Sequence, residues 1–112
     1  MSEHKSLINK KCTPCRGGIP PMSELEAKEM LKNLNQAWEI NSKGHLFYSF
    51  KFENFMQALS FANSISVIAE EEGHHPYLTV SWGSLGVEIW THKINGLSES
   101  DFILAAKIEV LE

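Results

Sequence analysis

The stretch that decides the fold runs from Tyr77 to His92 and reads YLTVSWGSLGVEIWTH. Apolar and polar residues alternate on both sides of Gly83-Ser84, which is typical of two half-buried strands. A two-residue loop that begins with glycine favours a type II′ hairpin turn. The stretch therefore predicts a β-hairpin within an antiparallel sheet, since strands joined by so short a loop run in opposite directions.

The expected turn also fixes a register. It pairs Trp82 with Leu85, and counting outward from there pairs His75 with His92. One apolar face should then meet the helices, and its members are Leu78, Val80, Trp82, Leu85, Val87 and Ile89. The other face should carry four rings, those of His75, Tyr77, Trp90 and His92. Direct neighbours on one face lie about 5 Å apart at Cβ. We therefore expect a small pocket in which imidazoles stand beside aromatic rings.

Two of the three predicted helices begin at clear capping residues near the chain ends. Ser23 and Glu26 form a capping box for a helix that reaches about Leu34. Ser98 and Asp101 cap a last helix that reaches about residue 111. The apolar stripes expected to be buried are Leu25, Met30, Leu31 and Leu34 in the first helix, and Phe102, Ala105, Ala106 and Ile108 in the last.

A long central helix is predicted directly before the hairpin. Asn54 caps it, and it runs from Phe55 to about Glu72. Gly73 is a natural residue just past a helix end, and Pro76 forbids continuation. The expected stripe is Phe55, Leu59, Ala62, Ile65 and Ala69. The paired histidines, His74 and His75, thus fall at the junction between this helix and the first hairpin strand.

A second hairpin completes the element order. Residues 38–40 and 45–52 alternate around the turn sequence NSKG. The resulting order, α-β-β-α-β-β-α, predicts an α+β fold in which a four-stranded antiparallel sheet carries helices packed on one face. Residues 1–21 end in RGGIPP and are expected to form an N-terminal arm, so residues 22–112 are expected to form one domain.

Composition excludes several classes of protein. The chain has 112 residues, a formal net charge of −4 and a pI near 5.7. A nucleic-acid surface needs a basic stripe, so we expect no nucleic-acid partner. No apolar run approaches the roughly 20 residues of a spanning helix, and the first residues lack the apolar core of a signal peptide. We therefore expect no membrane partner and a cytoplasmic protein.

The two cysteines, Cys12 and Cys15, form a single CTPC motif. One such pair supplies half of a four-thiolate zinc site, and no second pair exists. A redox pair would normally open a helix after a strand, whereas Arg-Gly-Gly follows here. A structural role is favoured, and metal and redox roles stay open.

The paired histidines are the candidate site. His74 sits just past a helix C-terminus, where carbonyl dipoles favour an imidazolium ion. Glu70 lies one helical turn earlier and is expected to reach it. His75 precedes proline and is held extended, so the two rings should point to different sides. Periodicity alone leaves a solvated polar loop as an even alternative.

The spacing of seven residues is more specific: Glu70, His74, His75, Pro76, Trp82, His92 and Asp101. This pattern resembles the signature of the pterin-4a-carbinolamine dehydratases, and the resemblance covers about residues 22–111. It implies dehydration of a 4a-hydroxytetrahydropterin to a quinonoid dihydropterin. It also implies that no metal or organic cofactor is needed, because the lone pair of the neighbouring ring nitrogen expels the leaving group.

The resemblance also assigns roles. It implies that His74 and His92 are the acid and base, with roles that exchange with the stereochemistry of the substrate. His75 orients the pterin, and Glu70 holds His74 in one tautomer. The residues expected to bind substrate are His74, His75, Pro76, Thr91, His92 and Trp38. Positioned proton transfer of this kind is worth about 10²–10⁴-fold per group.

Partners and rival functions follow from the same resemblance. Relatives form dimers or tetramers, so we expect a homo-oligomer, with a functional link to an aromatic amino-acid hydroxylase. One rival function is a non-enzymatic dimerisation partner of a transcription factor. The other is a zinc site built from His74, His75 and His92, which adjacent rings that point apart would suit poorly.

Overall fold

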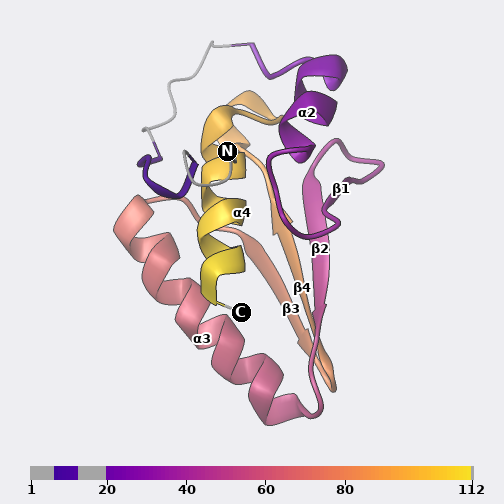
Figure 1. Cartoon of the computed structure of the whole chain (residues 1–112), viewed down its shortest axis with the longest axis vertical. Coiled ribbons are helices and arrows are strands. Elements are labelled where there is room, and N and C mark those ends of the chain that lie inside the picture. The colour runs from indigo at the N-terminus through magenta and orange to yellow at the C-terminus, as the bar shows by residue number, and fades with distance from the viewer. Residues whose placement is uncertain (1–6, 13–19, 112) are drawn as a thin grey trace.

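Four antiparallel strands form one sheet, in the spatial order β1-β2-β4-β3 (Figure 1). The structure is a computed structural model, and it describes residues 7–12 and 20–111. The strands are β1 (Glu39–Ile40), β2 (Leu46–Lys51), β3 (Tyr77–Ser81) and β4 (Ser84–Ile89). The helices are α2 (Glu24–Leu31), α3 (Phe55–Glu72), η1 (His92–Ile94, a 3₁₀ turn) and α4 (Glu99–Leu111).

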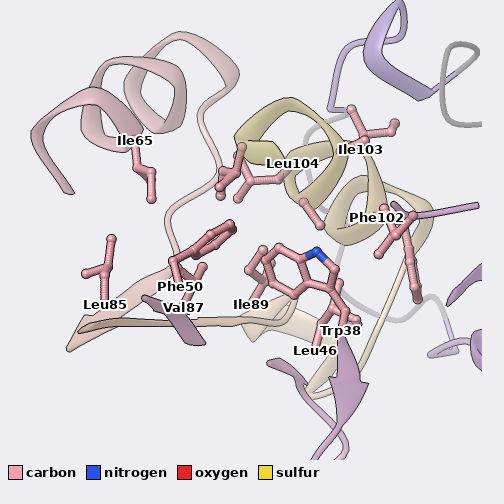
Figure 2. Close-up of a cluster of buried hydrophobic side chains, with 14 of the residues drawn as sticks. Trp38, Leu46, Phe50, Ile65, Leu85, Val87, Ile89, Phe102, Ile103 and Leu104 are labelled. Carbon is pink, nitrogen blue, oxygen red and sulfur yellow. The ribbon is translucent and has the colours of Figure 1, made fainter. Parts of the chain in front are cut away.

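The helices α3 and α4 lie together against one face of the sheet (Figure 1). The expected α+β class and the order α-β-β-α-β-β-α are therefore confirmed, with η1 as an addition. Figure 2 shows the core between the two layers, where Ile65 of α3 and Leu104 of α4 face the sheet. The four expected residues of α4 are all fully buried, and five further residues of that helix are also buried: Ser100, Asp101, Ile103, Leu104 and Glu109.

The predicted capping residues act as expected. Glu26 N–H donates to the Ser23 hydroxyl oxygen at 3.1 Å, and Ser23 N–H donates to the Glu26 carboxylate at 2.9 Å. The Asn54 side chain accepts from Gln57 N–H at 2.8 Å at the start of α3. Gly73 ends α3 with φ +65°, a left-handed conformation that glycine adopts without steric cost. These local signals thus fixed the start of α2 and both ends of α3.

The helical stripes were predicted less well. The helix α2 ends at Leu31 rather than near Leu34, and it buries Ala27 while leaving Leu25 78% exposed. Along α3 the face toward the core is rotated, because Ala58 and Phe61 are buried and the expected Phe55 and Leu59 are exposed. The remaining expected residues, Ala62, Ile65 and Ala69, are buried. The helix α3 must pack on both the sheet and α4, so its buried face is set by two neighbours rather than by its most apolar line.

The hairpin is present, but its predicted register was wrong. Ser81 pairs with Ser84 and Leu78 pairs with Val87, so the loop consists of Trp82 and Gly83. Gly83 has φ +76° and takes the second loop position instead of the first, and glycine permits a positive φ at either position. Each pairing therefore changes by two residues, which keeps every side chain on its predicted face. Trp82 is the exception, because it lies in the turn and is 74% exposed.

Part of the N-terminal arm packs on α4. Leu7 is buried in the main core cluster, and the Lys10 ammonium contacts the Glu99 carboxylate at 2.7 Å. The Cys12 thiol donates to the carbonyl oxygen of Ser100 at 3.4 Å. Burial, followed by the nearby Glu72 carboxylate, raises the pKa of Cys12 to about 12, so this thiol stays protonated at neutral pH. Cys15 lies outside the described residues.

Among residues 7–12 and 20–111, no helix has both the length and the apolar character needed to cross a membrane.

Candidate active site

The most enclosed histidine of the candidate site is His74, at the end of α3. Because Gly73 turns the chain in a left-handed conformation, His74 leaves the helix axis and its ring meets α4. Its Nε2 lies 2.6 Å from Oδ1 of Asp101, and the two side chains are 14% and 0% exposed. A buried carboxylate within hydrogen-bond distance of an imidazole fixes the orientation and tautomer of that ring.

The Asp101 carboxylate is itself fully hydrogen-bonded. Its Oδ2 accepts from Ser98 N–H at 2.8 Å and from the Thr91 hydroxyl at 2.8 Å, while Oδ1 faces His74. The Thr91 and Ser98 hydroxyls are also 2.9 Å apart. Asp101 thus fulfils its predicted role at the start of α4, and it also links that helix to His74. A buried acid with this many partners has one orientation, so the ring that it binds has one as well.

His75 faces a different carboxylate, and here the expected partner of Glu70 must be corrected. His75 Nε2 lies 2.6 Å from Glu70 Oε2, and both side chains are largely exposed, at 59% and 78%. Glu70 was expected to reach His74. The left-handed Gly73 carries His74 across to α4, and the next residue then lies over the last turn of α3. A contact between side chains this exposed contributes little to stability.

The third imidazole, that of His92, lies in an aromatic cluster. Its ring stacks on Trp90 with centroids 4.4 Å apart, and the Tyr77 ring meets it edge-on at 5.7 Å. Tyr77 and Trp90 also contact each other, at 4.5 Å. The sequence predicted four rings on this side of the hairpin, and three of them, Tyr77, Trp90 and His92, contact one another, whereas His75 contacts Glu70. His92 reaches them from η1 rather than from the strand, because β4 ends at Ile89 and no ladder pairs His75 with His92.

A shallow pocket brings the three histidines together. Its volume is about 160 Å³, and its lining residues are Gly73, His74, His75, Trp90, Thr91, His92 and Lys93. Pockets that enclose a whole drug-sized ligand measure about 300–1,000 Å³, so this pocket would hold part of such a ligand and leave the rest in solvent. Pro76 follows His75 directly but does not line the pocket. Four of the six predicted binding residues, His74, His75, Thr91 and His92, therefore share one cavity.

Trp38 lies elsewhere. It is buried in the core, and its ring nitrogen donates to Oε2 of Glu109 on α4 at 2.9 Å (Figure 2). It contacts the rings of Tyr48 and Phe50 rather than those of the pocket. The structure therefore does not bring Trp38 to the histidines. A buried indole needs a partner for its N–H, and Glu109 provides one on the helix side of the sheet.

Two groups near the pocket were not predicted. Asp101 was expected only as a helix cap, although it belonged to the seven-residue pattern. The pair of His45 and Glu88, with Nδ1 and Oε2 2.6 Å apart, had no signal in the sequence, since the two residues are 43 positions apart. Only the register of β2 against β4 brings them together.

Within the described ranges, 7–12 and 20–111, no group of three or more His, Cys, Asp or Glu side chains is arranged to hold a metal ion. His74 and His75 instead bind carboxylates on different helices.

The fold and the pocket define an α+β protein with three imidazoles at one end of its sheet, one of them held by a buried carboxylate. The family described as Pterin 4 alpha carbinolamine dehydratase matches residues 20–111. This chain therefore belongs to that family of dehydratases, and the resemblance seen in its sequence is confirmed.

Individual relatives agree. A protein of Rickettsia canadensis is 58% identical over 103 residues, covering 92% of this chain and 94% of the relative. One of Rickettsia bellii is 56% identical over 107 residues, covering 96% and 95%. Both are named "Putative pterin-4-alpha-carbinolamine dehydratase". A crystal structure from Brucella melitensis, titled as a transcriptional coactivator/pterin dehydratase, has a TM-score of 0.74 and 29% identity, covering 81% of this chain and 97% of its own.

Proposed function

We propose that this protein dehydrates a 4a-hydroxytetrahydropterin to a quinonoid dihydropterin by histidine acid and base catalysis. The observation that carries the proposal is the 2.6 Å contact between His74 and the fully buried Asp101, at a pocket that His75 and His92 also line. The family match supports the reaction class. The pocket supports the mechanism, because its side chains are the proton donors and acceptors that a dehydration needs.

The reaction has a simple balance. The C4a–O bond breaks and the hydroxyl leaves as water, so it must receive one proton as it departs. The lone pair of the neighbouring ring nitrogen forms the new double bond, and one proton then leaves the ring. One group must therefore donate a proton and another must accept one, and imidazoles do both near neutral pH.

In this proposal His74 is one of the two groups. Asp101 accepts a hydrogen bond from Nε2–H, which leaves Nδ1 of the neutral ring as the atom that can take a proton. The nearby carboxylate also stabilises the imidazolium that forms after transfer. Because Asp101 is fixed by Ser98 and Thr91, the ring does not have to reorganise during the reaction.

His92 is the second group, and His75 orients the pterin. His92 is exposed at the rim of the pocket and is held by ring contacts, so it can exchange protons with solvent between turnovers. His75 and its partner Glu70 are more exposed than His74 and Asp101, which suits a role in binding. Pro76 is next in the chain and restricts the backbone of His75.

We also infer the setting from the family. The protein would be a cytoplasmic homodimer or homotetramer. Its product would return to the cofactor pool of an aromatic amino-acid hydroxylase. These points stay predictions, and co-purification with such a hydroxylase activity and measurement of the mass in solution test them.

The decisive experiment is an assay of quinonoid dihydropterin formation with His74→Ala and His92→Ala. Each variant should lose about 10²-fold or more in kcat, since each removes a positioned proton-transfer group. Glu71→Gln, which changes an exposed acid beside Glu70, is the control and should match wild type. Full activity in both histidine variants would refute the mechanism.

The rival is a non-enzymatic partner module, because the Brucella melitensis protein is named as a transcriptional coactivator as well as a pterin dehydratase. A protein that only binds a partner does not need proton-transfer groups in a pocket. If the wild-type chain showed no rate above the uncatalysed reaction in this assay, the rival would be preferred.

A further inference from the structure

Three rings form a stack on the sheet face that is opposite the helices. The imidazole of His45 lies on Trp90 with centroids 3.9 Å apart and planes within 3°. His92 lies on the same indole at 4.4 Å and 28°. Two imidazoles at these distances cannot occupy one face of an indole without colliding. Trp90 is therefore held between His45 on one side and His92, a residue of the pocket, on the other.

The outer ring of the stack is fixed by a carboxylate. His45 Nδ1 lies 2.6 Å from Glu88 Oε2, and the side chains are 8% and 21% exposed. Asn41 completes this arrangement, since its Nδ2 donates to the same Glu88 oxygen at 3.1 Å and its Oδ1 accepts from His45 N–H at 3.0 Å. Both the backbone and the ring of His45 are thus tied to residues of β4 and the β1–β2 turn.

Glu88 is suited to this role by its charge and its place. Burial alone would raise the pKa of its carboxyl, but hydrogen bonds from His45 and Asn41 outweigh that effect and lower the pKa. Glu88 is therefore ionised at neutral pH. In the sheet it lies between Phe47 of β2 and Tyr77 of β3, on the face away from the core. The helices α3 and α4 lie on the other face, so this pair does not serve the main core.

His92 needs support of this kind. His74 and His75 are each oriented by a carboxylate. The ring of His92 makes no hydrogen bond to another residue that the structure describes, and only its contacts with Trp90 and Tyr77 hold it. Tyr77 is itself more than half exposed. The face of Trp90 is therefore the main surface that decides how the His92 ring is presented to the pocket.

We propose that His45 and Glu88 are positioning residues of the active site: they hold one face of Trp90, and the other face sets the orientation of His92. This inference rests on the proposed function, in which His92 exchanges a proton with the pterin. Neither residue touches the substrate. Both act through the indole, and errors of about 1 Å in the position of a reacting group can cost about 10²-fold in rate.

The test compares Glu88→Ala with Glu88→Gln in the full-length protein. The alanine variant removes the acceptor for His45, so kcat should fall about tenfold while KM changes less than twofold, because His92 is misplaced rather than lost. The glutamine variant keeps an acceptor oxygen at the same place and should restore kcat to within about threefold. Ile65→Val, a change at a core residue that does not line the pocket, controls for a general loss of stability.

A second readout does not depend on activity. Protons of an imidazole that lies over an indole are shifted upfield in the NMR spectrum. Both His45 and His92 should show this shift in the free wild-type protein and in Glu88→Gln, and the His92 signals should move toward ordinary values in Glu88→Ala. Trp82→Phe, which alters an exposed indole in the β3–β4 turn, should leave them unchanged.

The outcomes separate the two proposals. If His92→Ala abolishes activity but Glu88→Ala has wild-type kcat and unchanged His92 signals, the positioning role is refuted and the proposed function stands. If Ile65→Val loses as much kcat as Glu88→Ala at equal melting temperature, the pair is merely structural and the inference also fails. If His74→Ala and His92→Ala are both fully active, the proposed function fails, and the NMR spectra alone decide whether the stack orients His92.

Discussion

At the scale of single residues, Asp101 combines two tasks in one carboxylate. One oxygen accepts hydrogen bonds from Ser98 N–H, at the start of α4, and from the Thr91 hydroxyl, and the other oxygen faces His74. A side chain that caps a helix is already fixed in place, so a second hydrogen bond from it is well directed. The sequence pattern contained Asp101 but indicated only the cap, because the partner lies 27 residues away.

Replacing that carboxylate should affect the reaction more than the fold. In Asp101→Asn the size is kept and the charge is lost. The amide oxygen is needed by Ser98 N–H and the Thr91 hydroxyl, so the amide NH2 group would face His74 and favour the other tautomer of its ring. We expect kcat to fall about 10²-fold, and steady-state kinetics measure this. Glu109→Gln is the matched control, since Glu109 is another buried acid of α4 and binds residues 35–38 instead of the pocket. A kcat within twofold of wild type in Asp101→Asn would contradict the role of the carboxylate.

At the scale of elements, the junction between α3 and β3 places two histidines on different sides of the chain. Gly73 adopts φ +65° there, and no atom outside its chain neighbours lies within 4 Å of the position that a Cβ would take. The strain of a substitution would therefore come from the backbone alone. The same left-handed turn decides that His74 meets Asp101 and that Glu70 is left for His75.

A single methyl group tests this junction. Gly73→Ala should lower the free energy of unfolding by about 1–2 kcal/mol, the cost of a left-handed residue with a Cβ, and should lower kcat by displacing His74. Urea denaturation measures the first effect. Gly86→Ala is the control, because Gly86 does not have a positive φ and its added Cβ would make ordinary contacts of 3.5–3.6 Å with Phe47 and Thr79. Equal stability loss in both variants would argue against the conformational explanation.

The same region offers a test by pH. Glu72, at the end of α3, accepts from Lys107 Nζ at 2.7 Å and from Cys12 N–H at 2.8 Å. Burial acts to raise the pKa of the Glu72 carboxyl, but these hydrogen bonds outweigh it and lower the pKa below its ordinary 4.5. A carboxyl whose pKa is lower in the folded state than in the unfolded state stabilises the fold at any pH above the unfolded-state pKa. This stabilisation is lost as the pH falls through the folded-state pKa.

Glu72→Gln should therefore show a pH-dependent difference. At pH 7 the variant should be less stable than wild type by about 1–3 kcal/mol, and the difference should shrink as pH drops below about 4.5. Denaturation curves across this range measure it. A difference that stays constant with pH would mean that the charge of Glu72 does not matter. Glu29→Gln, at an exposed pair with Lys32, should show almost no difference at any pH.

At the scale of the whole molecule, the N-terminal arm is part of the folded unit where the structure describes it. Leu7 is 3% exposed and packs in the same cluster as the core of α4. The sequence predicted an arm separate from the domain, because loop residues follow it. Burial of an apolar side chain from the arm stabilises the packing of that segment.

Leu7 is buried and Leu25 is exposed, so truncating each of them tests whether the arm packs in the core. Leu7→Ala should lower the free energy of unfolding by about 2–4 kcal/mol, since it removes a buried side chain and leaves a cavity. Leu25→Ala removes the same atoms from a position that is 78% exposed and should change stability by less than about 0.5 kcal/mol. Thermal and urea unfolding of both variants measure the contrast. Equal effects would place Leu7 outside the core.

The sequence by itself determined the helix boundaries at Ser23, Asn54 and Gly73, the element order and the faces of the hairpin. These features depend on capping, glycine conformation and alternation, which act between residues close in the chain. It also placed the three histidines near one another. Only the tertiary structure decided the hairpin register, the rotation of α3 and the carboxylates that His74 and His75 bind. Those choices depend on contacts between segments that are distant in the chain, and local sequence patterns do not specify such contacts.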